Sequence, residues 1–180
     1  MGGNASDATW SIAAATLDTA LTAGVRLAGN LTVTGITTES NASTTYSTTN
    51  TGATNVLLTA SDGTWSVATG ALDTDLTNNI KYAGDLTVTG IASGNEILAL
   101  TKYTTDLTGA TTNTLTATDG RWDVSATALT TAINAGVRLA GAVVITTQPT
   151  LAELVTINNV TNGSITLNIT SQPLSGTAAD

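Results

Sequence analysis

Apolar residues recur at helical spacing after each of the three tryptophans in the chain. Leu17, Leu21 and Val25 follow Trp10 at intervals of four residues, a spacing that places side chains on one face of an α-helix. The same pattern follows the other two tryptophans as Leu72, Leu76 and Ile80 and as Leu129, Ile133 and Val137. We therefore predict one short helix after each tryptophan.

The segment after each predicted helix has the same order of residues in all three places. A basic residue comes first, and these are Arg26, Lys81 and Arg138. An Ala-Gly pair then leads into residues 31–34, 86–89 and 143–146, which are rich in Thr, Val and Leu and predict strands. Because the pattern returns after 55 residues and again after 57, we predict three copies of one unit.

The second half of each unit is less regular. In the third copy, residues 151–157 predict a short amphipathic helix after Pro149, and residues 164–170 alternate like a half-buried strand. In the first copy, residues 40–51 are a polar stretch of Ser, Thr and Asn. We interpret that stretch as a loop.

An Asp-Gly pair stands shortly before the second and the third tryptophan, as Asp62-Gly63 and Asp119-Gly120. Asp-Gly between alternating segments is a strong hairpin signal, because Gly tolerates the positive φ of a type I′ turn. The predicted hairpins pair residues 56–59 with 64–67 and residues 115–118 with 121–124.

Together these elements predict a mainly β protein with short helices. Three tandem units of about 55 residues would stack as a solenoid-like repeat, and small immunoglobulin-like β-sandwich lobes are the alternative. The predicted division is a leader at residues 1–6, followed by units at residues 7–61, 62–118 and 119–180. The structural markers of the three units are Trp10, Trp65 and Trp122.

The pattern is out of step at its two ends. Residues 7–12 look like the second strand of a hairpin, and residues 164–170 look like a first strand. Unpaired strand edges recruit other chains, so we expect assembly edges at Thr9, Trp10, Ser11, Ile12, Ile165, Leu167 and Ile169. Either the chain is a segment of a longer array, or its copies pair head to tail by strand addition.

The composition excludes several kinds of chemistry. The chain has no Cys and no His, so it has no disulfide, thiol nucleophile or imidazole base. Its net charge is −8, with five basic residues against thirteen acidic ones, which argues against nucleic acid as a partner. No apolar run reaches the length of roughly 18 residues that a membrane span requires, so we expect no membrane insertion.

Carboxylates remain as candidate chemistry. Asp62 and Asp119 are candidates for calcium ligands, because calcium binds carboxylate and carbonyl oxygens; no other cofactor is expected. Nothing in the sequence places two carboxylates together in an apolar pocket, as glycoside hydrolysis requires. We therefore expect the protein not to be an enzyme.

Two further sets of residues have both a functional and an ordinary interpretation. The three basic residues form a candidate line of positive charge, or they stabilise helix C-termini through the helix dipole. The Thr-x-Thr pairs are candidates for an ice-binding ladder, or they are ordinary strand residues. These pairs are Thr32 with Thr34 and Thr87 with Thr89.

Two segments resemble known proteins. Residues 62–67, Asp-Gly-Thr-Trp-Ser-Val, follow Leu58-Thr59-Ala60 and resemble a strand turn in repeat domains of giant bacterial adhesins. Residues 151–170 are similar to repeats in very long cell-surface proteins of marine and aquatic bacteria. The resemblance implies an extracellular or cell-surface location and a structural or adhesive role.

We therefore expect a non-catalytic structural or adhesive segment of a bacterial surface protein. Its partners would be neighbouring repeats, copies of itself, cell-surface glycans or capsid proteins. One alternative is a self-assembling subunit of a surface filament or of a virion, as a decoration or fibre protein. Another alternative is an ice- or carbohydrate-binding module.

Overall fold

The computed structural model describes residues 8–169, without the side chain of Glu39. Contacts divide the chain into two compact units. Unit 1 comprises the chain up to Leu86 together with Leu107–Thr111, and unit 2 comprises Thr87–Asp106 and the chain from Thr112 onward. The division falls inside one strand, β4 (Ile80–Ile91).

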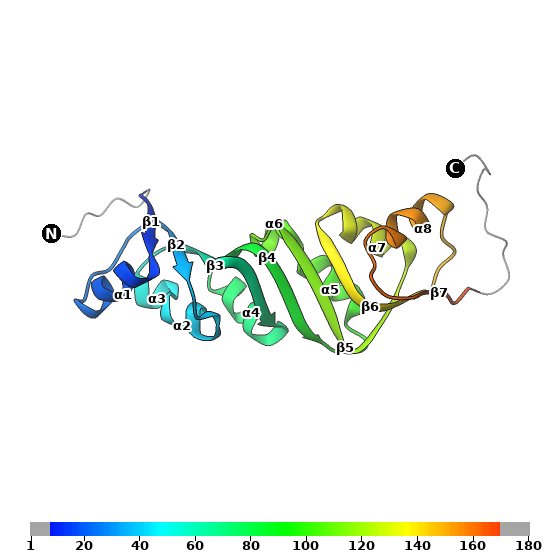
Figure 1. The fold of residues 1–180 in the computed structure, drawn as a ribbon, viewed down its shortest axis with the longest axis horizontal. Helices are drawn as coiled ribbons and strands as arrows, with labels where there is room; N and C mark the ends of the chain where they lie inside the picture. Colours follow the sequence, from blue (N-terminus) through cyan, green and yellow to red (C-terminus); the bar gives the residue numbers. More distant parts are fainter. Residues whose placement is uncertain (1–7, 170–180) are drawn as a thin grey trace. The chain divides into compact units, whose positions relative to one another are not determined.

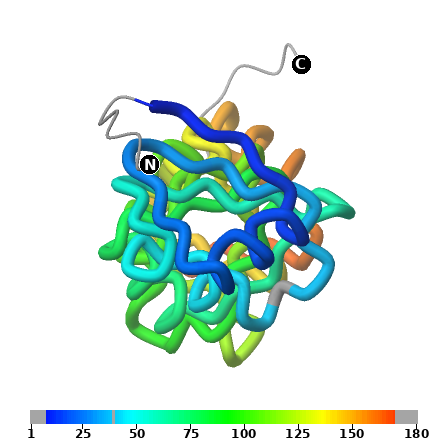
Figure 2. Tube along the Cα trace, turned by 90° about the vertical axis from the view of Figure 1, so that its left-hand side faces the viewer, coloured from blue at the N-terminus to red at the C-terminus, as the bar shows by residue number. Residues whose placement is uncertain are grey.

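Unit 1 alternates strands with short helices (Figure 1). Its strands besides the first part of β4 are β1 (Thr9–Ala13), β2 (Asn30–Ile36) and β3 (Asn55–Ala68). Its helices are α1 (Ala14–Thr22), α2 (Ala42–Thr45), α3 (Thr48–Thr51) and α4 (Thr69–Thr77), with a 3-10 turn η1 (Glu39–Asn41). The edge of unit 1 that carries β1 and α1, drawn in dark blue, faces the viewer in Figure 2.

Unit 2 continues the same alternation. Its strands besides the rest of β4 are β5 (Thr112–Val124), β6 (Val137–Ile145) and β7 (Ile165–Leu167). Its helices are α5 (Glu96–Lys102), α7 (Ala126–Asn134) and α8 (Leu151–Asn158), and α6 (Thr105–Thr108) lies at the division between the units.

The strands form one seven-stranded sheet in which neighbours follow chain order from β1 to β7. In unit 1, β2 pairs in parallel with β1 and β3, and in unit 2, β6 pairs in parallel with β5 and β7. Parallel neighbours need a crossover between them, and the short helices lie in those crossovers. The protein is therefore an α/β fold built on a parallel sheet.

This topology overturns the predicted fold class. The mainly β, solenoid-like stack of three units is wrong, because helices alternate with the strands as an integral second kind of element. The immunoglobulin-like alternative is also wrong, because such lobes are built from antiparallel sheets. The β-rich repeat description is wrong for the same reasons. The predicted division into a leader and three units stays a prediction.

The predicted hairpins are wrong as well. The chain passes through each Asp-Gly pair without reversing, so that β3 and β5 are single long strands. Gly63 and Gly120 do have positive φ, 75° and 70°. On β5 the register with β6 shifts between Thr116 and Arg121, as at a β-bulge that bends a strand without turning it back.

The helix predictions have mixed outcomes. The helices after each tryptophan are confirmed as α1, α4 and α7, and the helix at residues 151–157 is confirmed as α8. The predicted loop at residues 40–51 is wrong, because it contains η1, α2 and α3. Side chains cap these short turns locally: the Ser47 hydroxyl accepts a hydrogen bond from the Asn50 N–H at 3.2 Å.

The strand predictions at residues 31–34, 86–89 and 143–146 are confirmed within β2, β4 and β6, apart from Thr146, which lies just beyond β6. The inward residues of these strands are buried, and so is one leucine of the helix that precedes each strand. These fully buried leucines and valines include Leu17, Leu31, Val33, Leu72, Val88, Leu129 and Val143. The predicted end strands are confirmed over β1 and β7, whereas Asp7 and Thr170 lie outside the described residues.

Candidate functional site

The three tryptophans make the same hydrogen bond. Each indole Nε1–H donates to the carbonyl oxygen of an alanine 18 residues further along the chain. The pairs are Trp10 with Ala28 at 2.9 Å, Trp65 with Ala83 at 3.0 Å and Trp122 with Ala140 at 3.0 Å. Each tryptophan therefore links its own strand to the segment that comes after the next helix.

The glycine after each of these alanines lies very close to the backbone of another segment. Gly29, Gly84 and Gly141 have φ of 93°, 102° and 109°. A Cβ on each would overlap the backbone carbonyl of a facing residue, which is Ala8, Gly63 or Gly120 respectively. Only glycine allows the two backbones to approach this closely.

Trp10 differs from its two counterparts in exposure. Trp65 and Trp122 are 3% and 0% exposed, whereas Trp10 is 36% exposed. Within the described residues, β1 has β2 as its neighbouring strand on one side and no strand on the other. Trp10 therefore lies at an open edge of unit 1, as the sequence predicts, although its use in assembly stays a prediction.

A second segment at the same edge has one side without a partner strand among residues 8–169; on its other side the Leu27 N–H donates to the Thr51 carbonyl at 2.7 Å. Residues 25–28, which we call the open strip, correspond to Ile80–Ala83 and Val137–Ala140 in the sequence pattern. The later two segments are parts of β4 and β6, but the open strip belongs to no strand. Val25 is 45% exposed, whereas Ile80 and Val137 are 1% and 0% exposed.

The open strip was missed by the sequence analysis. The spacing of four residues predicts Val25 on a helical face with Leu17 and Leu21, but α1 ends at Thr22. Val25 aligns with Ile80 and Val137 in the repeated pattern, and each of those two residues begins a strand. That alignment indicates that Val25 occupies the position where a strand begins. Spacing of four residues alone does not show where a helix ends.

Unit 2 has its own open edge at β7. Ile165 and Leu167 pair with Val143 and Ile145 of β6, and no described strand lies on the other side of β7. Ile165 also borders a shallow groove with Leu154 and Val155 of α8. Ile169, the last predicted edge residue, is partly buried but lies beyond the end of the strand.

A buried polar pair distinguishes the middle of unit 1. The Tyr82 hydroxyl donates a hydrogen bond to the Asp75 carboxylate, and both side chains are buried. Burial, followed by the bond to Asp75, raises the pKa of Tyr82 far above its ordinary value. The Tyr82 ring also contacts Trp65 edge to face, with ring centroids 5.0 Å apart. This pair acts within the core and is not open to a ligand.

A second tyrosine pairs with an acid on α1. The Tyr46 hydroxyl donates to Asp18 Oδ1 at 2.9 Å. Burial, with the hydrogen bond and the negative charge of Asp18 as further causes, raises the pKa of Tyr46 to about 12. This contact joins the short helices after β2 to α1.

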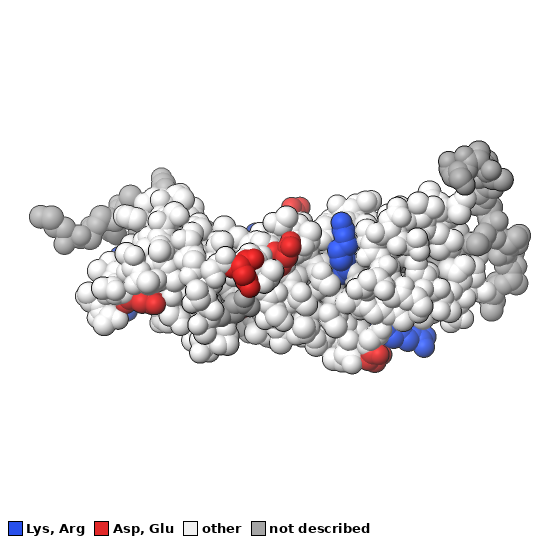
Figure 3. Space-filling view, viewed as in Figure 1, with Lys and Arg blue, Asp and Glu red and all other residues white. Residues whose placement is uncertain are grey.

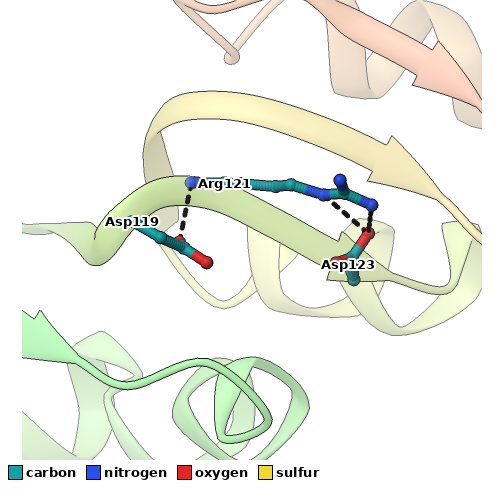
Figure 4. Close-up of polar contacts among 3 residues, drawn as sticks. All are labelled: Asp119, Arg121 and Asp123. Carbon is teal, nitrogen blue, oxygen red and sulfur yellow. Dashed lines mark hydrogen bonds and ion pairs between the residues drawn. The ribbon is translucent and has the colours of Figure 1, made fainter.

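The two aspartates that are candidates for calcium ligands each accept a hydrogen bond from a backbone N–H. Asp62 Oδ1 accepts a hydrogen bond from the Thr64 N–H at 3.0 Å, which lowers the pKa of Asp62. Asp119 Oδ1 accepts one from the Arg121 N–H at 3.0 Å, and the Arg121 guanidinium binds Asp123 at 2.7 Å (Figure 4). Among residues 8–169 no three acidic side chains gather in an arrangement that could hold a metal ion. Calcium binding stays a prediction.

The remaining candidates lie in ordinary surroundings. Arg26 and Arg138 each donate to a neighbouring backbone carbonyl, at 2.8 Å and 3.0 Å, and Arg138 also contacts the carbonyl of Ile133 near the end of α7. The threonines of the Thr-x-Thr pairs are all partly buried. On the face shown in Figure 3, charged side chains are few and scattered.

No helix in the described part of the chain is both long enough and apolar enough to span a membrane. Comparison with protein-family models, with curated proteins and with solved structures identifies no matching family, relative or structural neighbour.

Proposed function

We propose that the chain is a non-catalytic structural segment that gives a surface protein or a particle reach and contact area. The observation that supports this best is the recurrent bond from an indole N–H to an alanine carbonyl, made by Trp10, Trp65 and Trp122. The residues that recur in the sequence are those that fasten strands together, and they present no reactive group.

The surface chemistry is consistent with this role. Charged residues are 10% of the chain, well below the roughly 25% of an average soluble domain. A low-charge surface that is rich in hydroxyl groups makes broad, weakly selective contacts. The net charge of −8 keeps such a surface soluble through mutual repulsion of the chains.

Single-molecule pulling from the two ends of the chain tests the proposal. A load-bearing segment is expected to give discrete rupture events, because strands fastened by buried side chains open cooperatively. Trp65→Phe keeps an aromatic ring but removes the bond to Ala83, so it should lower the rupture force of one event. Smooth extension of the wild-type chain without discrete events would contradict a load-bearing role.

A ligand screen tests the opposite possibility. Thermal unfolding would be followed with sugars, nucleotides and divalent cations, each over a range of concentrations. A ligand that binds only the folded chain raises the unfolding temperature in a concentration-dependent way. We expect no such rise, and a saturable one would favour a ligand-binding role.

A further inference from the structure

The open strip at the β1 edge corresponds to two later segments, in β4 and β6, that each pair with a neighbouring strand. Before β4 and β6, a residue in the left-handed region ends the preceding helical segment: Asn79 has φ 58° and Gly136 has φ 81°. Gly24 precedes the open strip and has φ 80°. The chain thus leaves α1 through a left-handed residue, as it leaves α4 and α7.

In the two later segments, the residues that correspond to the open strip pair with β3 and with β5. In unit 1 the Val56 N–H donates to the Asn79 carbonyl at 2.9 Å. In unit 2 the Asn113 N–H donates to the Gly136 carbonyl at 3.1 Å, and Asn113 lies opposite Val137. The first half of β3 and of β5 therefore covers the residues that correspond to the open strip.

Strand β7 is equivalent to the first half of β3, which covers the start of β4. Val56 and Leu58 of β3 lie opposite Leu31 and Val33 of β2. Ile165 and Leu167 of β7 lie opposite Val143 and Ile145, which are the residues of β6 that correspond to Leu31 and Val33. By register, β7 has the relation to β6 that the covering half of β3 has to β2.

Within residues 8–169 no strand pairs with the outer side of β7, so among these residues its outward backbone groups have no strand partner. Successive N–H groups of a strand point to opposite sides, and the Val143 N–H bonds to the Ser164 carbonyl while the Asn168 N–H bonds to the Ile145 carbonyl. The peptide groups of Ile165 and Leu167 therefore face away from β6. Those are the groups that Val56 uses toward Asn79 in unit 1.

We propose that β7 of one copy pairs in parallel with the open strip of a second copy, so that copies join head to tail. Ile165 would lie opposite Val25, and Leu167 opposite Leu27. The contact would cover the exposed part of Val25 and lie beside Trp10, whose indole binds the last residue of the strip, Ala28. The inference rests on the proposed structural role and specifies its partner as a second copy of this chain.

Disulfide trapping tests the register directly, because the chain contains no cysteine. Val25→Cys and Ile165→Cys would be made as separate proteins, mixed and oxidised. Neighbouring strands lie about 5 Å apart, a separation that a disulfide bridges, so we expect a covalent mixed dimer. Thr166→Cys in place of Ile165→Cys is the matched control, because its side chain points to the opposite face of β7, and it should not link.

Light scattering over a range of protein concentrations tests the association itself. Val25→Lys puts a charge in place of the apolar side chain that would lie opposite Ile165, and should abolish oligomers. Leu98→Lys changes another exposed apolar residue, on α5 between β4 and β5 in the chain, and should leave oligomers unchanged. A mixture of Val25→Cys and Ile165→Cys that does not link, or Val25→Lys oligomers equal to wild type, would overturn the head-to-tail pairing.

The two proposals fail in different ways. If wild-type chains associate but the cysteine pair does not link, the head-to-tail register is wrong and the structural role remains supported by association. If pulling shows no rupture events and a small ligand stabilises the chain, the structural role is wrong. A linked mixed dimer would then still show that β7 reaches the open strip.

Discussion

Tyr82 donates a hydrogen bond to the carboxylate of Asp75 inside the core of unit 1. The two residues correspond to Leu27 and Ala20 in the first segment of the pattern, and to Leu139 and Ala132 in the third. The middle segment therefore carries a polar pair at positions where the other two segments have apolar residues. Each partner of such a pair depends on the other, because a buried polar group without its partner is costly.

Tyr82→Phe should lower the free energy of unfolding by about 1–3 kcal/mol, since it leaves the buried Asp75 carboxylate without this donor. The double variant Asp75→Ala with Tyr82→Phe removes both polar groups and keeps the ring contact with Trp65. We expect it to recover most of the loss. Urea denaturation of the wild type and both variants measures this. A double variant less stable than Tyr82→Phe would contradict the coupling.

Alkaline pH should destabilise the fold through Tyr46. Its pKa is about 12 in the folded chain, against an ordinary value of 10.0, so the folded chain holds this proton more tightly. The stabilisation is fully present below pH 10.0 and is lost as the pH rises toward about 12. Tyr82 acts in the same direction.

Tyr46→Phe serves as the control for this pH dependence. The variant has no hydroxyl proton to lose, so its stability should fall less steeply above pH 10.0 than that of the wild type. Urea midpoints measured across the alkaline range compare the two. Parallel curves would show that the Tyr46 hydroxyl does not contribute.

Two glycines that face each other should respond differently to a methyl group. Gly84→Ala would force a Cβ into the Gly63 carbonyl at a φ of 102°, and we expect a loss of roughly 3 kcal/mol or more. Gly63→Ala meets no atom within 4 Å, although its φ is 75°, and should cost about 1–2 kcal/mol. Thermal and urea unfolding of both variants give the comparison, and equal losses would mean that the close approach is unimportant.

The tryptophans should differ in their contribution to stability according to burial. Trp122→Ala is expected to lower the free energy of unfolding by about 3–5 kcal/mol, as for other buried large-to-small changes. Trp10→Ala should cost clearly less, because that ring is 36% exposed at the edge of β1. The comparison is made by urea denaturation at a protein concentration where the chain is monomeric. A larger loss at Trp10 would mean that β1 is part of the central core.

The Asp-Gly pairs permit a test of calcium binding against a structural role. Asp62→Asn keeps an oxygen that can accept the Thr64 N–H, so it should leave the stability close to that of the wild type. Asp62→Ala removes that acceptor and should lower the stability more than Asp62→Asn does. Calcium titration of the wild type is expected to leave the unfolding temperature unchanged. A rise that is lost in Asp62→Asn would instead identify Asp62 as a ligand.

The sequence alone determined the local elements. The spacing of Leu17 and Leu21 predicts α1, and the alternation at residues 86–89 predicts part of β4, because a helix and a strand have different side-chain periods. It also indicated Trp10, Trp65 and Trp122 as equivalent positions, and all three make the same hydrogen bond. These features depend on neighbours close along the chain.

Tertiary structure alone decided how the strands pair. The residues Asp62-Gly63 suit a hairpin as well as a bulge, since both need a glycine with positive φ. Only the pairing of whole strands decides between them: at the equivalent Asp119-Gly120, β5 continues in parallel with β6 through a register shift and does not turn back. Val25 shows the same limit: whether it is buried like Ile80 or exposed depends on a strand distant in sequence, and no local pattern reports the presence of that strand.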